Sequence, residues 1–342
     1  MKSGLTAMCL GLALGWAPAA AEEPVVVKVG ITNVVADVGF YVADKRGYFA
    51  AENLKVDLVS FDAAAKMIAP LASGDLDVGG GGVSAGLFNA VARGVGLRIV
   101  ADKSSSYLGV GTGALMVRKD LVESGRYKTP LDLKGAKLAL PAAGTATSTS
   151  LQRFFSKFGM SLHDMDLVYL SFPQMVGAMR NKAIEAAFMT EPSVTTATRS
   201  GDAARVVGDD EMFPNHQIAV TLFSERFINA RRDVAVRFMR AFLRGVRDYA
   251  STVKDGRLSG PGSEDMIAIL TQYSLVKDPA VYRGITVHGC DPDGKLNLDS
   301  LQIDFDYFKS EGLIEGKVAV VDAIDASIAA EAVRDLGPYK PM

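Results

Sequence analysis

The sequence has few of the residues on which common catalytic and structural chemistries depend. Its 342 residues include two cysteines, three histidines and one tryptophan. No His-Glu-x-x-His segment, cysteine pair or histidine pair stands at metal-ligand spacing, so we expect no metal site and no cofactor. Lysine and arginine number 37 against 39 acidic residues, and no basic run stands out, which argues against nucleic acid as a partner.

Long hydrophobic runs are also missing, apart from one short run near the start. Lys2 precedes the apolar residues 7–16, and three alanines precede Glu22. The run is too short to span a bilayer, and the pattern predicts a signal peptide over residues 1–21. Cleavage would remove Cys9 and leave Cys290 alone, so the mature chain could form no internal disulfide. We therefore expect an exported protein.

Apolar runs bounded by turns alternate with amphipathic stretches in the rest of the chain. The predicted strands are residues 25–31, 54–61 and 76–81, and the predicted helices are residues 41–49, 64–73 and 83–92. Strands that alternate with helices are typical of parallel βαβ units, so the sequence predicts an α/β protein.

The same order of strands and helices occurs twice. Residues 56–84 align with residues 165–193, with Asp57-Leu58-Val59 on Asp166-Leu167-Val168 and one single-residue slip further on. This repeat predicts two similar α/β lobes. Because open α/β sheets bind ligands beyond the carboxyl ends of their strands, two lobes with facing strand ends would form a ligand cleft with a hinge.

Four segments together resemble one protein family. They are GFYVADKRGYFAAENLKVDL, LASGDLDVGGGGVSAG, residues 118–170 from RKDLVES to DLVYL, and AAFMTEPS. They are similar to the periplasmic substrate-binding proteins of ABC importers, in the branch associated with nitrate, sulfonates such as taurine, and pyrimidine precursors of thiamine. The resemblance implies a type II periplasmic-binding-protein fold, capture of a ligand by hinge closure, and a permease in the inner membrane as partner.

The resemblance also implies how the chain is divided. Residues 22–113 and 222–342 would form lobe 1, and residues 114–221 would form lobe 2. Residues 111–113 and the strand 218–223 would cross between the lobes. We expect the protein to act as a monomer.

The segment PAAGTATSTSLQRFF is the strongest candidate for ligand binding. A strand ends at Pro141 and a helix begins near Thr145 or Thr147, so free backbone N–H groups meet the hydroxyls of Thr145, Thr147 and Ser148. This arrangement suits an anionic or strongly polar group. The same hydroxyls could instead only cap the helix.

Other candidates also follow predicted strands. They are Asp37, Phe40, Tyr41, Gly82, Ser84, Tyr107, Gln174 and Glu191. One of the two aromatic residues Phe40 and Tyr41 is expected in the core, and Ser84 could serve only as a helix cap. Glu191 follows an apolar run, so its carboxylate needs a donor, which could be a ligand cation or a protein hydroxyl.

Enzymatic alternatives remain beside the binding protein. Residues 82–86, GVSAG, match a hydrolase nucleophile elbow, and His288 with Asp291 or Asp293 would complete a triad. No histidine precedes Ser84, however, so the usual oxyanion loop is missing. Some relatives of these binding proteins on the same fold are enzymes that make the thiamine pyrimidine or dehydrate a small acid. The pyrimidine synthases among them carry a cysteine-rich iron-binding stretch that this chain lacks. We therefore expect a binding protein for a small anionic or zwitterionic organic molecule rather than an enzyme, serving an importer or a membrane sensor.

Overall fold

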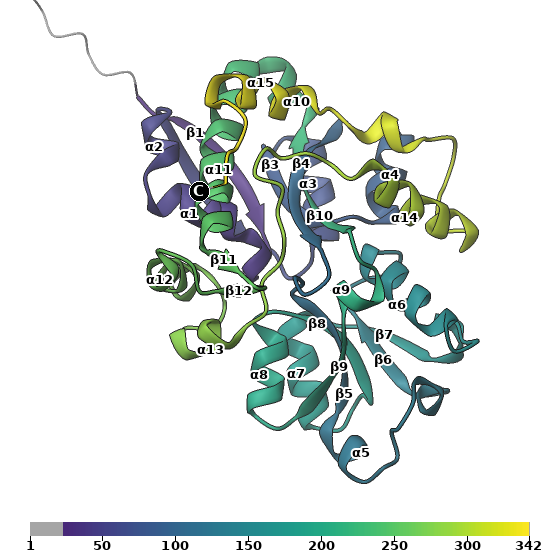
Figure 1. The fold of residues 1–342 in the computed structure, drawn as a ribbon. Coiled ribbons are helices and arrows are strands. Elements are labelled where there is room, and N and C mark those ends of the chain that lie inside the picture. Colours follow the sequence, from purple (N-terminus) through teal and green to yellow (C-terminus); the bar gives the residue numbers. More distant parts are fainter. Residues whose placement is uncertain (1–22, 342) are drawn as a thin grey trace, which may run out of the picture.

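The structure, a computed structural model, describes residues 23–341, so the predicted signal peptide lies outside the described residues. The chain forms two α/β lobes, which are stacked one above the other in Figure 1. Lobe 1 is built on the strand order β2-β1-β3-β10-β4, and lobe 2 on the order β7-β6-β8-β5-β9.

Lobe 1 contains both chain ends of the described region. Its sheet comprises β1 (Val25–Ile31), β2 (Leu54–Ser60), β3 (Val78–Gly82), β4 (Leu97–Ser106) and β10 (His216–Ser224). Its helices are α1 (Val38–Lys45), α2 (Tyr48–Ala51), α3 (Ile68–Ser73), α4 (Ala85–Ala92), α10 (Glu225–Ala230), α11 (Arg232–Thr252), α12 (Ser263–Tyr273), α13 (Pro279–Gly284), α14 (Leu298–Ser310) and α15 (Ser327–Leu336). The strands β11 (Val253–Lys254) and β12 (Arg257–Leu258) form a small hairpin after α11.

Lobe 2 is a single continuous segment. Its strands are β5 (Gly113–Arg118), β6 (Lys137–Leu140), β7 (Asp166–Tyr169), β8 (Ala186–Thr190) and β9 (Ala203–Gly208). Its helices are α5 (Lys119–Glu123), α6 (Ala146–Ser156), α7 (Phe172–Arg180), α8 (Ser193–Arg199) and α9 (Asp209–Met212). Single 3₁₀ turns complete the two lobes: η1 (Val35–Asp37), η2 (Ala64–Met67), η3 (Pro130–Leu133), η4 (Leu162–Asp164) and η5 (Val320–Ala323).

The two sheets have the same topology, which confirms the predicted two-lobe α/β fold. In lobe 1, β1 pairs in parallel with β2 and β3, and β10 runs antiparallel to β3. In lobe 2, β6 pairs in parallel with β7 and β8, and β5 runs antiparallel to β8. The sequence repeat therefore reflects a repeated βαβ arrangement.

The chain crosses twice between the lobes, before β5 and before β10. The sequence-based division at residues 221 and 222 falls inside β10, which pairs with β4 from His216 to Ser224. This pairing assigns residues 216–221 to the sheet of lobe 1, so the second crossover precedes His216. The expectation that the strand 218–223 crosses between the lobes is therefore wrong, because its backbone hydrogen bonds lie within one sheet.

Helix α11 anchors the core of lobe 1 and sets the place of two predicted site residues. Phe40 packs against Phe242 of α11 with ring centroids 4.8 Å apart, and Tyr41 stacks on Tyr273 at 5.1 Å. Both Phe40 and Tyr41 are fully buried. Neither ring can contact a ligand, although one of the two was expected to, because α1 turns both of them into the core.

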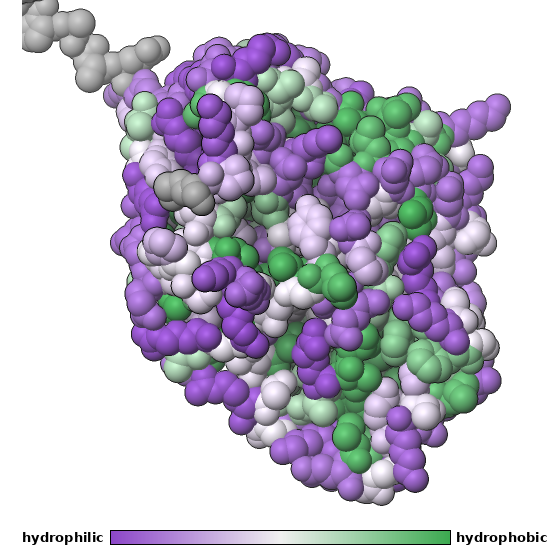
Figure 2. All heavy atoms as spheres, viewed as in Figure 1, coloured by the Kyte–Doolittle hydropathy of each residue, from purple (hydrophilic) through white to green (hydrophobic). Residues whose placement is uncertain are grey.

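The described helices include none that is long and apolar enough to cross a membrane. Hydrophilic residues cover most of the face shown in Figure 2, on both lobes. The apolar side chains of each lobe instead fill clusters on either side of its sheet.

Candidate functional site

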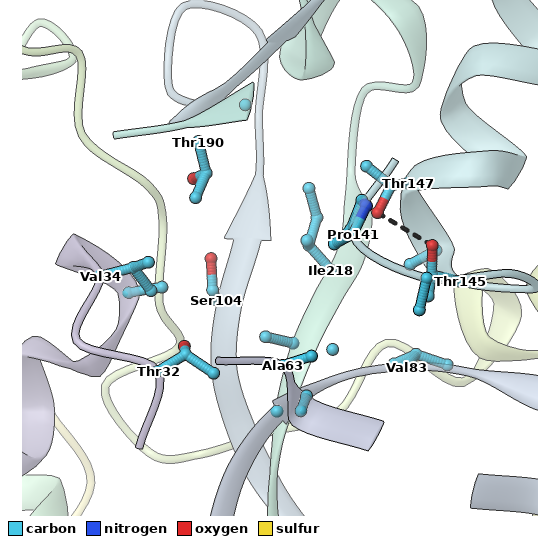
Figure 3. Close-up of a pocket in the computed structure, with 18 of the residues that line it drawn as sticks. Thr32, Val34, Ala63, Val83, Ser104, Pro141, Thr145, Thr147, Thr190 and Ile218 are labelled. Carbon is cyan, nitrogen blue, oxygen red and sulfur yellow. Dashed lines mark hydrogen bonds between the residues drawn. The ribbon is translucent and has the colours of Figure 1, made fainter. Parts of the chain in front are cut away.

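A cavity of about 120 Å³ lies between the lobes. Its walls are the turns that follow the carboxyl ends of strands in both sheets, as the sequence predicts for facing α/β lobes. Residues from these turns surround the cavity in Figure 3: Thr32, Val34, Ala63 and Val83 come from lobe 1, and Pro141, Thr145, Thr147 and Thr190 from lobe 2. The side chains of Ser104 and Ile218, from β4 and β10, also reach it.

The amino end of α6 forms one wall of the cavity. This helix begins at Ala146 with Thr145 at its N-cap position, as predicted. Thr145 Oγ1 donates to Thr147 Oγ1 at 3.1 Å, the bond drawn in Figure 3, and both residues line the cavity. Ser148 lies beside Thr145, with the two hydroxyl oxygens 3.4 Å apart, but it is buried against the protein and does not line the cavity. The wall thus offers hydroxyl groups and the positive end of a helix dipole.

The glycine-rich turn after β3 forms the opposite wall. Gly82 and Ser84 both line the cavity. The Oγ of Ser84 accepts a hydrogen bond from the backbone N–H of Leu87 at 3.3 Å, which confirms Ser84 as the N-cap of α4. The Ser84 oxygen caps the start of α4 as an acceptor, so its O–H group can still donate a hydrogen bond to a ligand.

A buried ion pair borders the cavity and was missed from the sequence. Lys103 lines the cavity with its side chain 3% exposed, and its Nζ lies 2.8 Å from Asp37 Oδ1. The second carboxylate oxygen of Asp37 accepts from the backbone N–H groups of Thr32 and Val34 and from the hydroxyl of Tyr41. Asp37 is fully buried and does not line the cavity, because it is turned inward to hold this loop and Lys103.

Two further polar groups at the cavity were also missed. Ser104 follows Lys103 on β4, and no residue of the described region 23–341 hydrogen-bonds to its Oγ, whereas Ser105 and Ser106 bond to Asp102 and Phe213. Asp209 lies at the start of α9, and its carboxylate accepts from the N–H of Gly113 at 2.9 Å. Burial raises the pKa of Asp209 to about 7. Lys103 and the serines at 104–106 follow an apolar stretch within one strand. This pattern could have indicated polar groups at the cavity from the sequence.

Tyr107 and Gln174 also lie away from the cavity. Tyr107 is 40% exposed in the turn after β4 and pairs with Val110. Gln174 accepts from the N–H and hydroxyl of Ser171 and so caps α7. Neither residue lines the cavity.

Glu191 also faces away from the cavity. Its carboxylate accepts from the N–H of Thr195 at 3.0 Å and from the hydroxyl of Thr195 at 2.8 Å. The donor that this buried carboxylate requires is thus a protein hydroxyl, one of the two alternatives that the sequence left open. Burial raises the pKa of Glu191 to about 7. Its backbone carbonyl accepts from Val35 of lobe 1, so the residue stands at the lobe boundary.

A chain of serine, histidine and aspartate occurs in the structure, but not at Ser84. His216 Nδ1 lies 2.9 Å from Ser150 Oγ, and His216 Nε2 lies 2.9 Å from Asp304 Oδ1. All three residues are fully buried, and none lines the cavity. His288, the predicted partner of Ser84, is buried beside Tyr249. The Ser150 chain joins α6, β10 and α14, and its burial gives no substrate access to the hydroxyl.

The NMT1/THI5 like family matches residues 36–252, well over half of the chain. The chain belongs to this family. A related sequence, the taurine-binding periplasmic protein of Escherichia coli K12, is 30% identical over 171 residues. That match covers 50% of this chain and 49% of the relative, so it spans about half the length of each protein.

Solved structures share the fold of this family member over most of its length. The alkanesulfonate-binding protein SsuA of Xanthomonas axonopodis pv. citri, bound to MOPS, is 22% identical with a TM-score of 0.68, over 89% of this chain and 99% of that one. The nitrate-binding protein NrtA of Synechocystis PCC 6803 is 12% identical with a TM-score of 0.75, over 92% and 90%. The desulfurization enzyme DSZB is 14% identical with a TM-score of 0.59, over 91% and 99%. At these identities the likeness shows the periplasmic-binding-protein fold alone.

Proposed function

We propose that this protein is exported to the periplasm, captures a small anionic or zwitterionic organic molecule between its lobes, and delivers it to an ABC permease in the inner membrane. The observation that carries the proposal is the cavity itself, whose walls come from the strand ends of both lobes. A ligand that contacts both walls favours the closed arrangement of the lobes, so binding is coupled to hinge closure.

The size of the cavity limits the ligand. An engineered protein cavity of about 150 Å³ holds benzene. The interlobe cavity, at about 120 Å³, therefore suits a molecule of roughly that size or smaller. A short sulfonate such as taurine is of this size, whereas MOPS, with its morpholine ring, requires more room than this arrangement of the lobes provides.

The charges at the cavity favour a zwitterion within the proposed class. The positive charge of Lys103 is already paired with Asp37, and Asp209 adds a second carboxyl group with a pKa of about 7. An acidic group of the ligand would lie at the amino end of α6, while an amino group would lie toward Asp209. A ligand without net charge avoids placing an uncompensated charge in a dry cavity.

The residues that line the cavity also support binding over catalysis. Among the described residues, the lining includes hydroxyl, small and apolar side chains and the charged residues Asp62, Lys103 and Asp209, but neither cysteine nor histidine. A hydroxyl nucleophile generally requires a neighbouring base for activation. Ser84 has a backbone N–H as its partner, and the histidine that contacts a serine lies in the buried Ser150 chain.

The proposal is tested by thermal unfolding and calorimetric titration with taurine, ethanesulfonate, MOPS and nitrate as probes. A ligand that binds only the folded protein increases the free energy of unfolding, by about 2.7 kcal/mol when its concentration is a hundred times Kd. The melting temperature rises as a result. We expect taurine to stabilise the protein more than ethanesulfonate, which lacks the amino group, and more than MOPS. Stabilisation by nitrate alone would contradict an organic ligand.

The Ser104→Ala variant locates the binding event. Its Oγ faces the cavity without a protein partner, so the substitution removes a ligand contact and should weaken binding about fivefold with little change in stability. Ser156→Ala is the matched control, because Ser156 is exposed at the far end of α6. Equal affinities in both variants would remove Ser104 from the site.

A further inference from the structure

The main chains of the two lobes are joined directly beside the cavity. Residues 83–85 of lobe 1 and residues 144–146 of lobe 2 run antiparallel, with Ser84 opposite Thr145. The N–H of Ala85 donates to the carbonyl of Gly144 at 2.8 Å, and the N–H of Ala146 donates to the carbonyl of Val83 at 2.9 Å. We call this pair of backbone hydrogen bonds the interlobe bridge.

The interlobe bridge satisfies donors that each lobe cannot satisfy alone. Ala85 and Ala146 are the first residues of α4 and α6, and the first N–H groups of a helix have no partner within the helix. Each helix therefore obtains its missing acceptor from the other lobe. When the lobes separate, both N–H groups must turn to water, so the interlobe bridge forms only in the closed arrangement.

The interlobe bridge also seals one side of the cavity. Val83, Ser84, Thr145 and Ala146 line the cavity while they form or flank the bridge. In Figure 3, Val83 and Thr145 lie on the same side of the cavity, on segments that come from different lobes. While this contact is intact, a ligand inside the cavity cannot leave on that side.

The carbonyl of lobe 2 that accepts the hydrogen bond from Ala85 belongs to a glycine with no space for a side chain. Gly144 has φ +58, and a Cβ at this position would lie 2.9 Å from Leu313 Cδ1 and 3.1 Å from Ala85 Cβ. Leu313 and Ala85 both belong to lobe 1, where they pack in the same cluster. The steric conflict of a side chain at residue 144 is therefore with the opposite lobe.

We propose that Gly144 is a positioning residue for lobe closure. Without a side chain, the two backbone segments approach closely enough to form the interlobe bridge, and the bridge slows ligand release from the cavity. The effect on ligand release rests on the proposed function. The effect on the bridge depends only on the contacts between the lobes.

The test is hydrogen exchange at the amides of Ala85 and Ala146, for the protein alone and with each probe that stabilises it. Gly144→Ala should speed exchange at both amides about tenfold, since overpacking of this kind disfavours the closed arrangement. Gly135→Ala is the matched control, because Gly135 is also in lobe 2 with φ +72 but has nothing within 4 Å of an added Cβ. The control carries the same backbone strain and should leave both amides as protected as in the parent protein.

A second substitution separates positioning from general damage. Leu313→Ala in the Gly144→Ala background removes the atom nearest to the added Cβ, so it should restore part of the protection. Protection that is equal in the Gly144 and Gly135 variants, or absent from the parent protein under both conditions, would overturn the inference, as would failure of Leu313→Ala to restore any protection. If no probe binds while the exchange pattern follows expectation, the proposed function fails and the role of Gly144 in the bridge stands.

Discussion

Lys103 and Asp37 form a buried ion pair beside the cavity, and its contribution to the free energy of unfolding can be measured. Their charged atoms lie 2.8 Å apart, with the side chains 3% and 0% exposed. Replacing Lys103 by methionine keeps most of the side-chain volume but leaves the Asp37 carboxylate buried without its counter-ion. Breaking a buried ion pair in this way typically costs about 3–5 kcal/mol.

The expected loss lies at the lower end of this range. Asp37 retains hydrogen bonds from the backbone N–H groups of Thr32 and Val34 and from the Tyr41 hydroxyl, which continue to stabilise its charge. We therefore expect Lys103→Met to reduce the free energy of unfolding by about 3 kcal/mol. At roughly 2 °C per kcal/mol for a chain of this size, the melting temperature should fall by about 6 °C.

Urea unfolding of Lys103→Met, Asp37→Asn and the double variant measures the coupling. The double variant should be more stable than the sum of the single losses predicts, because neither charge is then left unpaired. Lys66→Met is the matched control, since Lys66 pairs with Asp62 on the surface with both side chains more than 60% exposed, and its loss should be below about 1 kcal/mol. A loss below about 1 kcal/mol for Lys103→Met, or additive single effects, would refute the buried pair.

Stability should also depend on pH, because burial raises the pKa values of Asp102, Glu191 and Asp209 to about 7. Their contribution to the free energy of unfolding is present below the unfolded pKa near 4 and is lost as the pH rises through about 7. Urea midpoints should fall over this window, and Asp209→Asn should make the fall shallower; an unchanged slope would contradict this. Ser150→Ala should lower the free energy of unfolding by about 1–3 kcal/mol in urea titrations, because His216 Nδ1 loses its buried partner. An unchanged urea midpoint would contradict a stabilising contact between Ser150 of α6 and His216 of β10.

The sequence alone was sufficient for most of the elements and for their repetition, although the predicted helix 41–49 is two helices, α1 and α2. Strands and helices follow from hydrophobic periodicity, which each segment carries within its own residues. The repeat between residues 56–84 and 165–193 accordingly appears as two sheets of identical strand order. The starts of helices could also be predicted from neighbouring residues, since Ser84 and Thr145 stand at the N-cap positions of α4 and α6.

Only the tertiary structure decided which side chains reach the cavity. Asp37 was predicted to contact the ligand because it follows β1. In the structure, Lys103 on a different strand holds the Asp37 carboxylate in the interior. The interlobe bridge was not visible in any local pattern, because it joins two turns that are distant in the chain. Periodicity encodes whether a residue is buried, whereas the cavity arises where two lobes meet, and that contact is a property of both segments together.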